Sequence, residues 1–309
     1  MQRSRPRPPF GPGQPYHIGW PRRSGTSQER GRRLATERLG SVIVRLSPSA
    51  PPPAVTPSGH LRRGWTGRLV GFVREHGRFT VSVTAVLCLL AAVCAARAYG
   101  PAGIGLTLGP VVAVVLVVFS RRRGLTWSDL GLSRRTWARG AAYAAAAVAV
   151  VAAVYAVAAM VPLTRMAFVD VRYEMPASKA MLTAFVLIPL GTVLVEEIAF
   201  RGVLLGLVTR HRGHRWGLAL SSVAFGAWHI LPSLGLSQQN AAMHAVAGAG
   251  TGGQIGGVLA AVVFTSVAGA LLAELRRRSG SILAAAGLHW AVNALGVLIA
   301  AILFAATAS

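Results

Sequence analysis

Residues 195–201 read Val-Glu-Glu-Ile-Ala-Phe-Arg and lie inside an apolar run that extends from about residue 180 to residue 208. A charged side chain at the centre of a membrane helix costs about 2.5–3.5 kcal/mol. Two adjacent carboxylates and an arginine in such a run therefore predict a membrane helix whose charged residues face the interior of a helix bundle.

The two carboxylates differ in their neighbours along the helix. Arg201 follows Glu197 by four residues, so both side chains lie on one helix face and can form an ion pair. A structural ion pair explains Glu197 as well as a functional role does. Glu196 has Phe200 at the same spacing and no cation. Glu196 is therefore the stronger candidate for a functional group.

The composition of the chain favours a membrane protein. Of its 309 residues 53% are hydrophobic and 13% are charged, whereas about 25% of the residues of a soluble domain are charged. Several apolar runs approach the roughly 20 residues that cross a bilayer. We expect an all-α, polytopic transmembrane helix bundle of about seven spans. The expected spans are about 80–98, 102–120, 141–162, 180–209, 217–232, 255–274 and 281–306.

The chain divides into three expected regions. Residues 1–78 are rich in arginine and proline and predict a disordered cytoplasmic tail. Residues 79–178 would form N-terminal transmembrane helices, with a short interfacial helix within the loop 121–140. Residues 179–309 hold the motifs and would form the catalytic bundle. Within them, the uncharged segment 233–254 is expected to be a loop, and its His244 a solvated residue.

The net charge of +23 is explained by arginines in the tail and in short loops between apolar runs. With seven spans, every basic loop falls on one side of the membrane, so we expect a multi-pass protein of the inner (plasma) membrane with a cytoplasmic N-terminus. Membrane lipid is an expected partner, with the tail either bound to anionic lipid or simply solvated. No nucleic-acid partner is expected.

Two later apolar runs also contain polar residues. Phe225 precedes His229 by one helical turn, and Asn293 follows His289 by one turn. At about 1.5 Å per residue, the distances from the cytoplasmic helix ends are roughly 18–20 Å for Glu196, 20 Å for His229, 12 Å for His289 and 18 Å for Asn293. These similar depths predict one pocket that holds these residues together with Glu197.

Such a pocket allows peptide hydrolysis. A carboxylate can act as general base on water, while histidine and asparagine can stabilise an oxyanion. Glu196, His229 and His289 could instead hold a metal ion, with zinc as the natural candidate. The sequence contains neither an H-E-x-x-H pair nor a G-x-S-x-G elbow. The choice between a metal and a carboxylate mechanism therefore stays open.

These motifs, in this order, resemble those of the CPBP family of intramembrane proteases, which includes the type II CAAX prenyl endopeptidases and the abortive-infection domain proteins. The family pattern is E-E-x-x-x-R, then F-x-x-x-H, then H-x-x-x-N. Here it reads Glu196-Glu197 to Arg201, Phe225 to His229 and His289 to Asn293. The resemblance covers about residues 180–306.

The resemblance implies a role for each motif residue. Glu196 would be the general base and would act on the attacking water together with His229. His289 and Asn293 would stabilise the oxyanion or help to bind a metal. The ion pair of Glu197 with Arg201 would orient Glu196. Phe200 and Phe225 would support the substrate pocket, with Phe225 close to His229.

The function that follows is an intramembrane endopeptidase acting on a membrane-associated or CaaX-like peptide. The alternative is a non-catalytic member of the family, a bacteriocin-immunity or scaffold protein that binds a peptide in the same pocket. A transporter is disfavoured because the polar residues fall in the last four spans, without the repeated halves that such proteins show.

Overall fold

The computed structural model describes residues 60–308, except 102 and 249, and side chains from residue 75 to residue 306. All the regular elements in the described part are helices, and one isolated β-bridge joins Asp170 to Asn240. The prediction of an all-α bundle is confirmed. Residues 1–59 of the expected tail lie outside the described part of the chain.

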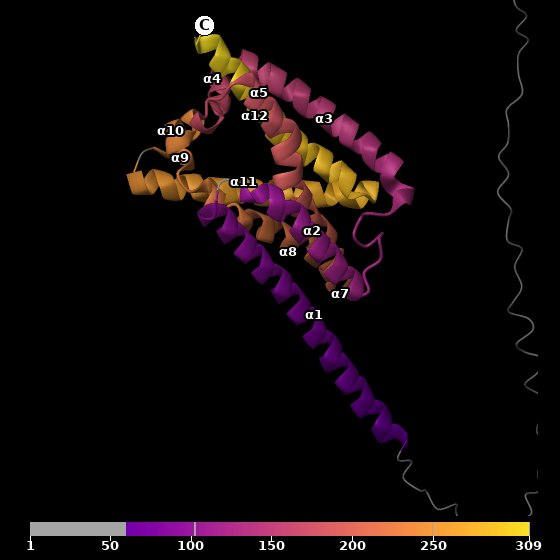
Figure 1. Cartoon of the computed structure of the whole chain (residues 1–309). Coiled ribbons are helices and arrows are strands. Elements are labelled where there is room, and N and C mark those ends of the chain that lie inside the picture. The colour runs from indigo at the N-terminus through magenta and orange to yellow at the C-terminus, as the bar shows by residue number, and fades with distance from the viewer. Residues whose placement is uncertain (1–59, 102, 249, 309) are drawn as a thin grey trace, which may run out of the picture. The chain divides into compact units, whose positions relative to one another are not determined.

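The first two helices form an antiparallel hairpin, in which α1 (His60–Tyr99) runs beside α2 (Ile104–Arg122) (Figure 1). Helix α1 begins 20 residues before the expected span, so the prediction that the tail extends to residue 78 is wrong for residues 60–78. Apolar residues at helical spacing explain this extension. They are Leu61, Trp65, Leu69 and Val73.

The loop between α2 and α3 does not contain the expected interfacial helix. Only a 3-10 turn, Arg134–Thr136, precedes α3 (Trp137–Met160). Gly124 and Gly131 adopt φ values of 85° and 70°, which end helical geometry at both places. The side chains of Leu125 and Leu130 are buried, so this part of the loop packs into the bundle.

The fourth span, Ala177–Arg212, is long, and its backbone is irregular. Its backbone alternates between α-helical and wider π-helical segments, which often occur at functional sites. The α-helical parts are α5 (Ala177–Leu182), α6 (Leu194–Glu196) and α7 (Leu205–Arg212), and the π-helical parts are Thr183–Leu187, Pro189–Val193 and Glu197–Leu204.

The next span is broken. Helix α8 (His214–Trp228) ends four residues before its expected end, and the chain bends by 44° into the pair formed by a 3-10 turn and α9 (Leu236–Gln239). Helix α10 (Ala241–Ala247) follows. The prediction that residues 233–254 form a plain loop is therefore wrong. The side chain of Asn240 caps α10 by accepting a hydrogen bond from the Met243 N–H.

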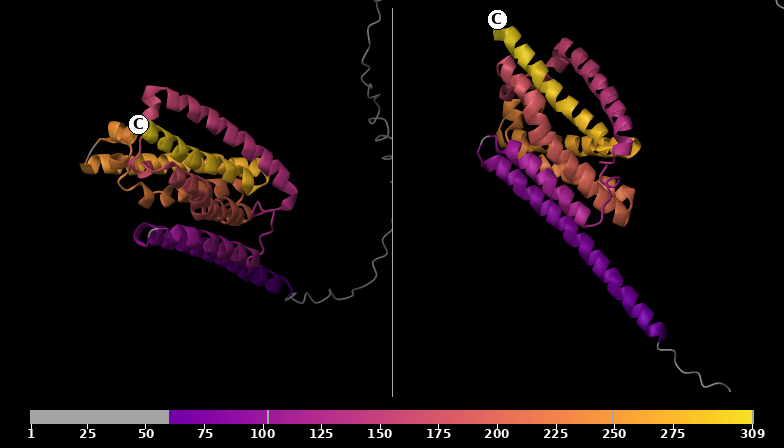
Figure 2. Two further views of the ribbon diagram at one scale, coloured as in Figure 1. Left: turned by 45° about the horizontal axis from the view of Figure 1, so that its top comes forward. Right: turned by 45° about the vertical axis from the view of Figure 1, so that its right-hand side comes forward.

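Two long helices, α11 (Gly250–Ser279) and α12 (Ile282–Ala308), complete the bundle. Helix α12 lies beside α3, and α11 beside α8 (Figures 1 and 2). The described part of the chain contains six helices that are long and apolar enough to cross a membrane, or seven if the bent pair is one span. This number agrees with the predicted count of about seven.

Two segments that connect spans are joined to each other on the side of the bundle away from the basic loops. The first contains α4 (Pro162–Arg165) and two 3-10 turns, Met166–Phe168 and Val171–Tyr173. Its buried Asp170 forms an ion pair with Arg172 at 2.7 Å and accepts a hydrogen bond from Asn240 Nδ2 at 3.3 Å. We call this set of contacts the Asp170–Asn240 clasp.

We expect acid to open the Asp170–Asn240 clasp. Burial raises the pKa of Asp170, but hydrogen bonds and the charge of Arg172 outweigh this effect and lower the pKa below its ordinary value of 3.8. The stabilisation is therefore complete above pH 3.8 and is lost as the pH falls through the lower pKa of the folded state. Hydrogen exchange of residues 236–247 should accelerate over that range.

The substitution Asp170→Asn should give faster exchange in residues 236–247 already at neutral pH and should remove most of the acid-dependent acceleration. Glu174→Gln is the matched control, because Glu174 is exposed in the same connection and forms no ion pair with another described residue. Equal exchange in the two variants at every pH would contradict the role assigned to Asp170.

Candidate active site

Glu196 and Glu197 are both buried in the middle of the irregular fourth span. Their exposed fractions are 3% and 1%. Glu196 ends α6, and Glu197 begins the π-helical segment that continues to Leu204. Two carboxylates this deeply buried require compensation by nearby charges or hydrogen bonds.

Glu197 is compensated by the predicted ion pair. Arg201 Nη1 lies 3.0 Å from Glu197 Oε1, and the Arg201 side chain is completely buried. No guanidinium nitrogen of Arg201 has an aligned hydrogen bond to another described residue. Its Cζ instead lies 3.9 Å from the ring centroid of Phe225, so a cation–π contact supplies the second part of the stabilisation.

His289 connects the two carboxylates. Its Nδ1 lies at hydrogen-bond distance from Glu197 Oε1, 2.8 Å, and its Nε2 lies 3.7 Å from Glu196 Oε2. Because the Glu197 carboxylate accepts, Nδ1 is the donor. Arg201, Glu197, His289 and Glu196 thus form a continuous buried chain of polar groups from the fourth span to α12.

Phe225 lies between the two predicted histidines. Its ring makes edge contacts with His229 at a centroid distance of 4.6 Å and with His289 at 5.7 Å. The His229 Nδ1 lies 2.7 Å from the Phe225 carbonyl oxygen, to which it can only donate. This tautomer leaves Nε2 of His229 able to accept a proton. Phe200 packs on Phe225 from the fourth span, at 5.2 Å.

The remaining predicted residues are less closely engaged. Asn293 is half-buried on α12, one turn after His289, and its side chain makes no hydrogen bond to another described residue. His244 is exposed on α10, with Nδ1 3.2 Å from the carbonyl oxygen of Ser237. Its exposure agrees with the expectation of a solvated residue.

The arrangement does not fit the predicted zinc site. In the part of the chain that the structure describes, no three His, Cys, Asp or Glu side chains are gathered so that they could hold a metal ion. Glu196 and His289 are neighbours, but His229 does not complete a set of three with them. We therefore derive no step through a metal ion.

Sequence reasoning missed Arg97, a residue of α1 that supports the fourth span. Its guanidinium donates to the Gly191 carbonyl oxygen at 2.8 Å and to Thr192 Oγ1 at 3.1 Å. Its Cζ also lies 5.9 Å from the ring centroid of Trp228. One signal was available, because Arg97 ends an apolar span on the side where the positive-inside rule does not place arginine.

Three neighbouring helices donate side-chain hydrogen bonds to backbone carbonyls of the fourth span. Besides Arg97 of α1, Ser221 of α8 donates to the Phe200 oxygen at 2.8 Å, and Trp290 of α12 donates to the Ala184 oxygen at 2.8 Å. Such bonds are needed where a helix departs from regular geometry within a membrane. They fix the helix that carries Glu196 from three directions.

Comparison with known proteins agrees with this geometry. Residues 178–295 match the family model described as type II CAAX prenyl endopeptidase Rce1-like. This part of the chain belongs to the CPBP family. The match covers every residue of the predicted site and less than half of the chain. No curated protein and no solved structure matched.

The match is to a family of CAAX-type intramembrane proteases, and the matched region carries the buried carboxylates. The helices α1 to α4 and their connections lie before residue 178 and are therefore outside the match. Nevertheless, Arg97 of α1 donates a hydrogen bond to the carbonyl oxygen of Gly191, which precedes Glu196 in the fourth span. The N-terminal helices therefore help to build the CPBP site.

We expect Glu197→Gln to destabilise the protein strongly, because it leaves the buried charge of Arg201 without its partner. Breaking a buried ion pair in this way costs about 3–5 kcal/mol. Thermal unfolding in detergent should show a large fall in midpoint. Glu196→Gln, the control in the adjacent position, should cause a much smaller fall. The double variant Glu197→Gln/Arg201→Met should recover part of the loss, and a double variant as unstable as the single one would contradict the pairing.

We expect Arg97→Gln to loosen the fourth span at Gly191. Loss of a hydrogen bond from a charged donor costs about 1.5–3 kcal/mol. Hydrogen exchange should therefore accelerate locally in residues 188–196. Arg135→Gln removes an equal charge at an exposed position with no ion pair in the described structure and should leave this exchange unchanged. Unchanged exchange in both variants would show that Arg97 does not support the span.

Proposed function

We propose that this protein is an intramembrane endopeptidase that hydrolyses a membrane-associated or CaaX-like peptide, with water activated by Glu196. The observation that carries the proposal is the placement of Glu196. Its carboxylate is buried, and its Oε2 has no hydrogen-bond partner among the described residues. A buried acceptor left without a donor suits a general base that binds a water molecule.

The distance between Glu196 and His289 supports this role. Oε2 and Nε2 are 3.7 Å apart, which is too long for a direct hydrogen bond. Two polar groups at this separation can share one water, with each at the usual distance of about 2.8 Å. That water would be the nucleophile.

In the proposed reaction, the water oxygen forms a bond to the carbonyl carbon of the scissile peptide, and Glu196 takes the proton that the water releases. The resulting tetrahedral intermediate carries its negative charge on the former carbonyl oxygen. When the carbon–nitrogen bond breaks, Glu196 returns the proton to the leaving amine. His229, whose Nε2 is free to accept, would help to orient the same water.

His289 and Asn293 are the proposed donors to the oxyanion. Only the imidazolium form of His289 donates from both ring nitrogens, from Nδ1 to Glu197 and from Nε2 toward the substrate. The His289 ring lies beside two carboxylates, those of Glu196 and Glu197. The Asn293 amide, one turn along α12, would supply the second donor.

The described structure also offers a place for apolar substrate groups. A pocket of about 310 Å³ lies between α1 and α8 and is bounded by Trp228 and by Phe200, which packs on Phe225 of the site. Its other lining residues are mostly aliphatic. A peptide with apolar side chains or a CaaX-like C-terminus would suit such a surface.

The arginine distribution supports a multi-pass protein of the inner (plasma) membrane with a cytoplasmic N-terminus. Helices α2, α7 and α11 each have two or three basic residues in their last turn. Along the chain, these basic helix ends alternate with connections that contain few basic residues. This orientation is part of the proposal.

The decisive experiment compares wild type with Glu196→Gln in detergent on a library of apolar peptides. The substitution keeps the shape of the side chain and removes the base, so cleavage should fall by about 10²–10⁴-fold. Glu174→Gln, an exposed control, should cleave as wild type does.

A strong chelator in parallel reactions distinguishes the two chemistries. Unchanged cleavage supports the carboxylate mechanism, whereas loss of cleavage that zinc restores would support the zinc alternative. Full activity of Glu196→Gln would contradict the proposed base. If no peptide is cut, while the folded protein retains a bound peptide, the non-catalytic binding or immunity function would replace the peptidase.

A further inference from the structure

A second pocket, of about 800 Å³, lies far from the candidate active site, where α1 meets the ends of α2 and α7. Part of its lining is apolar and comes from Phe79, Leu125 and Leu207. Phe79 stacks on His211 at a ring distance of 4.1 Å. Nothing in the peptidase proposal uses this pocket. We call it the basic pocket because of its charged residues.

Four arginines from three helices and one loop surround the basic pocket, against a single carboxylate, Glu75. None of these five residues forms an ion pair with another described residue. Arg210 donates to the carbonyl oxygen of Gly124, which does not neutralise its charge. The arginines are Arg78, Arg122, Arg123 and Arg210.

The ends of two helices do not account for this concentration of charge. Helices α2 and α7 end at the pocket, and each helix C-terminus carries about half of a negative charge. Two helix ends and Glu75 together therefore balance about two of the four arginines. The rule that basic residues face the cytoplasm explains their side of the membrane, but not their convergence on one pocket.

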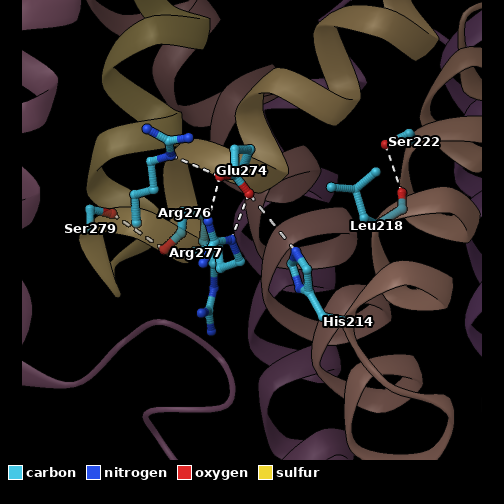
Figure 3. A network of polar contacts seen from close by, with 8 residues as sticks. His214, Leu218, Ser222, Glu274, Arg276, Arg277 and Ser279 are labelled. Atoms are coloured by element: carbon cyan, nitrogen blue, oxygen red, sulfur yellow. Dashed lines mark hydrogen bonds and ion pairs between the residues drawn. The ribbon is translucent and has the colours of Figure 1, made fainter.

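The basic end of α11, at the same side of the bundle, is different. Figure 3 shows Glu274 at the centre of a network there, in contact with Arg277 and with His214 of α8. Arg277 donates to Glu274 at 2.6 Å, and Arg278 donates at 2.7 Å. Arg276 donates to the carbonyl oxygens of Ser128 and Asp129. Among the described residues, this cluster therefore has partners within the protein, whereas the four arginines of the basic pocket form no ion pair.

We propose that the basic pocket binds the phosphate-bearing headgroup of an anionic membrane lipid. The arginines would bind the phosphate, for which guanidinium groups are well suited. Phe79, Leu125 and Leu207 would contact the beginning of the acyl chains. The pocket lies where the apolar part of α1 begins, near residue 75, and where α2 ends, so it is at the level of the headgroups.

A soluble phosphate compound shares the headgroup chemistry but fits the location less well. The apolar lining and the position at the ends of the spans both favour a ligand that also carries hydrocarbon. The proposal does not depend on peptidase activity, because the pocket shares no residue with the candidate active site. Its test therefore needs no substrate.

The test measures lipid binding to the full-length protein in a neutral detergent by native mass spectrometry, with phosphatidylglycerol and phosphatidylcholine as probes. Wild type should bind phosphatidylglycerol more tightly than phosphatidylcholine. Arg78→Gln/Arg122→Gln should weaken phosphatidylglycerol binding by about 30-fold, the equivalent of about 1 kcal/mol for each arginine. Arg78→Lys/Arg122→Lys keeps the charge and should retain most of the binding.

Arg277→Gln/Arg278→Gln is the matched control, since it removes the same charge from a cluster in which both arginines already form an ion pair with Glu274. It should change binding by less than about twofold, because those charges are already paired. Equal losses in the two Gln double variants would overturn the proposal in favour of general surface charge. The proposal would also be overturned if inorganic phosphate at millimolar concentration competed with the lipids and the protein showed no preference for phosphatidylglycerol. That result would indicate a soluble anion as the ligand. Normal gel filtration and thermal unfolding of all variants ensure that a loss of binding reflects the pocket.

Discussion

The buried ion pair of Glu197 with Arg201 is the constraint on which the rest of the site depends. A guanidinium with no exposed surface cannot stay charged in a membrane bundle without a counter-charge. Glu197 supplies that charge, and Phe225 supplies a ring face at 3.9 Å. Glu197 then holds His289 through Oε1, which brings Nε2 toward Glu196. The position of His289 relative to Glu196 therefore follows from the compensation of Arg201.

The irregular backbone of the fourth span is compensated in a similar way by its neighbours. Hydrogen bonds from Arg97, Ser221 and Trp290 reach its carbonyl oxygens from three different helices. Such bonds both satisfy polar groups within the membrane and limit how far the helix can move. A carboxylate placed on so constrained a helix keeps its geometry without needing a hydrogen bond of its own. This explains how Glu196 can remain an available acceptor in a buried position.

The sequence predicted the helices and the ion pair of Glu197 with Arg201 because both leave local patterns. Apolar runs of nearly 20 residues indicate spans, and the spacing of Glu197 and Arg201 by one turn indicates their ion pair. The contacts of Arg97 with Gly191 could not be predicted, since they join residues 94 positions apart. The depth estimate predicted one pocket for His289 and the two carboxylates, but it could not predict the 2.8 Å contact between His289 and Glu197, because it assumes helices parallel to the membrane normal.

The connections show where pattern reasoning fails for a physical reason. Segments 121–140 and 233–254 were assigned from composition alone, as an interfacial helix and a loop. In the first, two glycines with positive φ end the helix, and Leu125 and Leu130 pack into the bundle. In the second, Asn240 caps α10 and bonds Asp170, which joins the segment to another connection. Both outcomes depend on tertiary partners, which supply the free energy that the local sequence does not. Composition alone does not indicate how the connections of a membrane bundle fold. Residues that can cap a helix or form a hydrogen bond to another connection are the more informative signal.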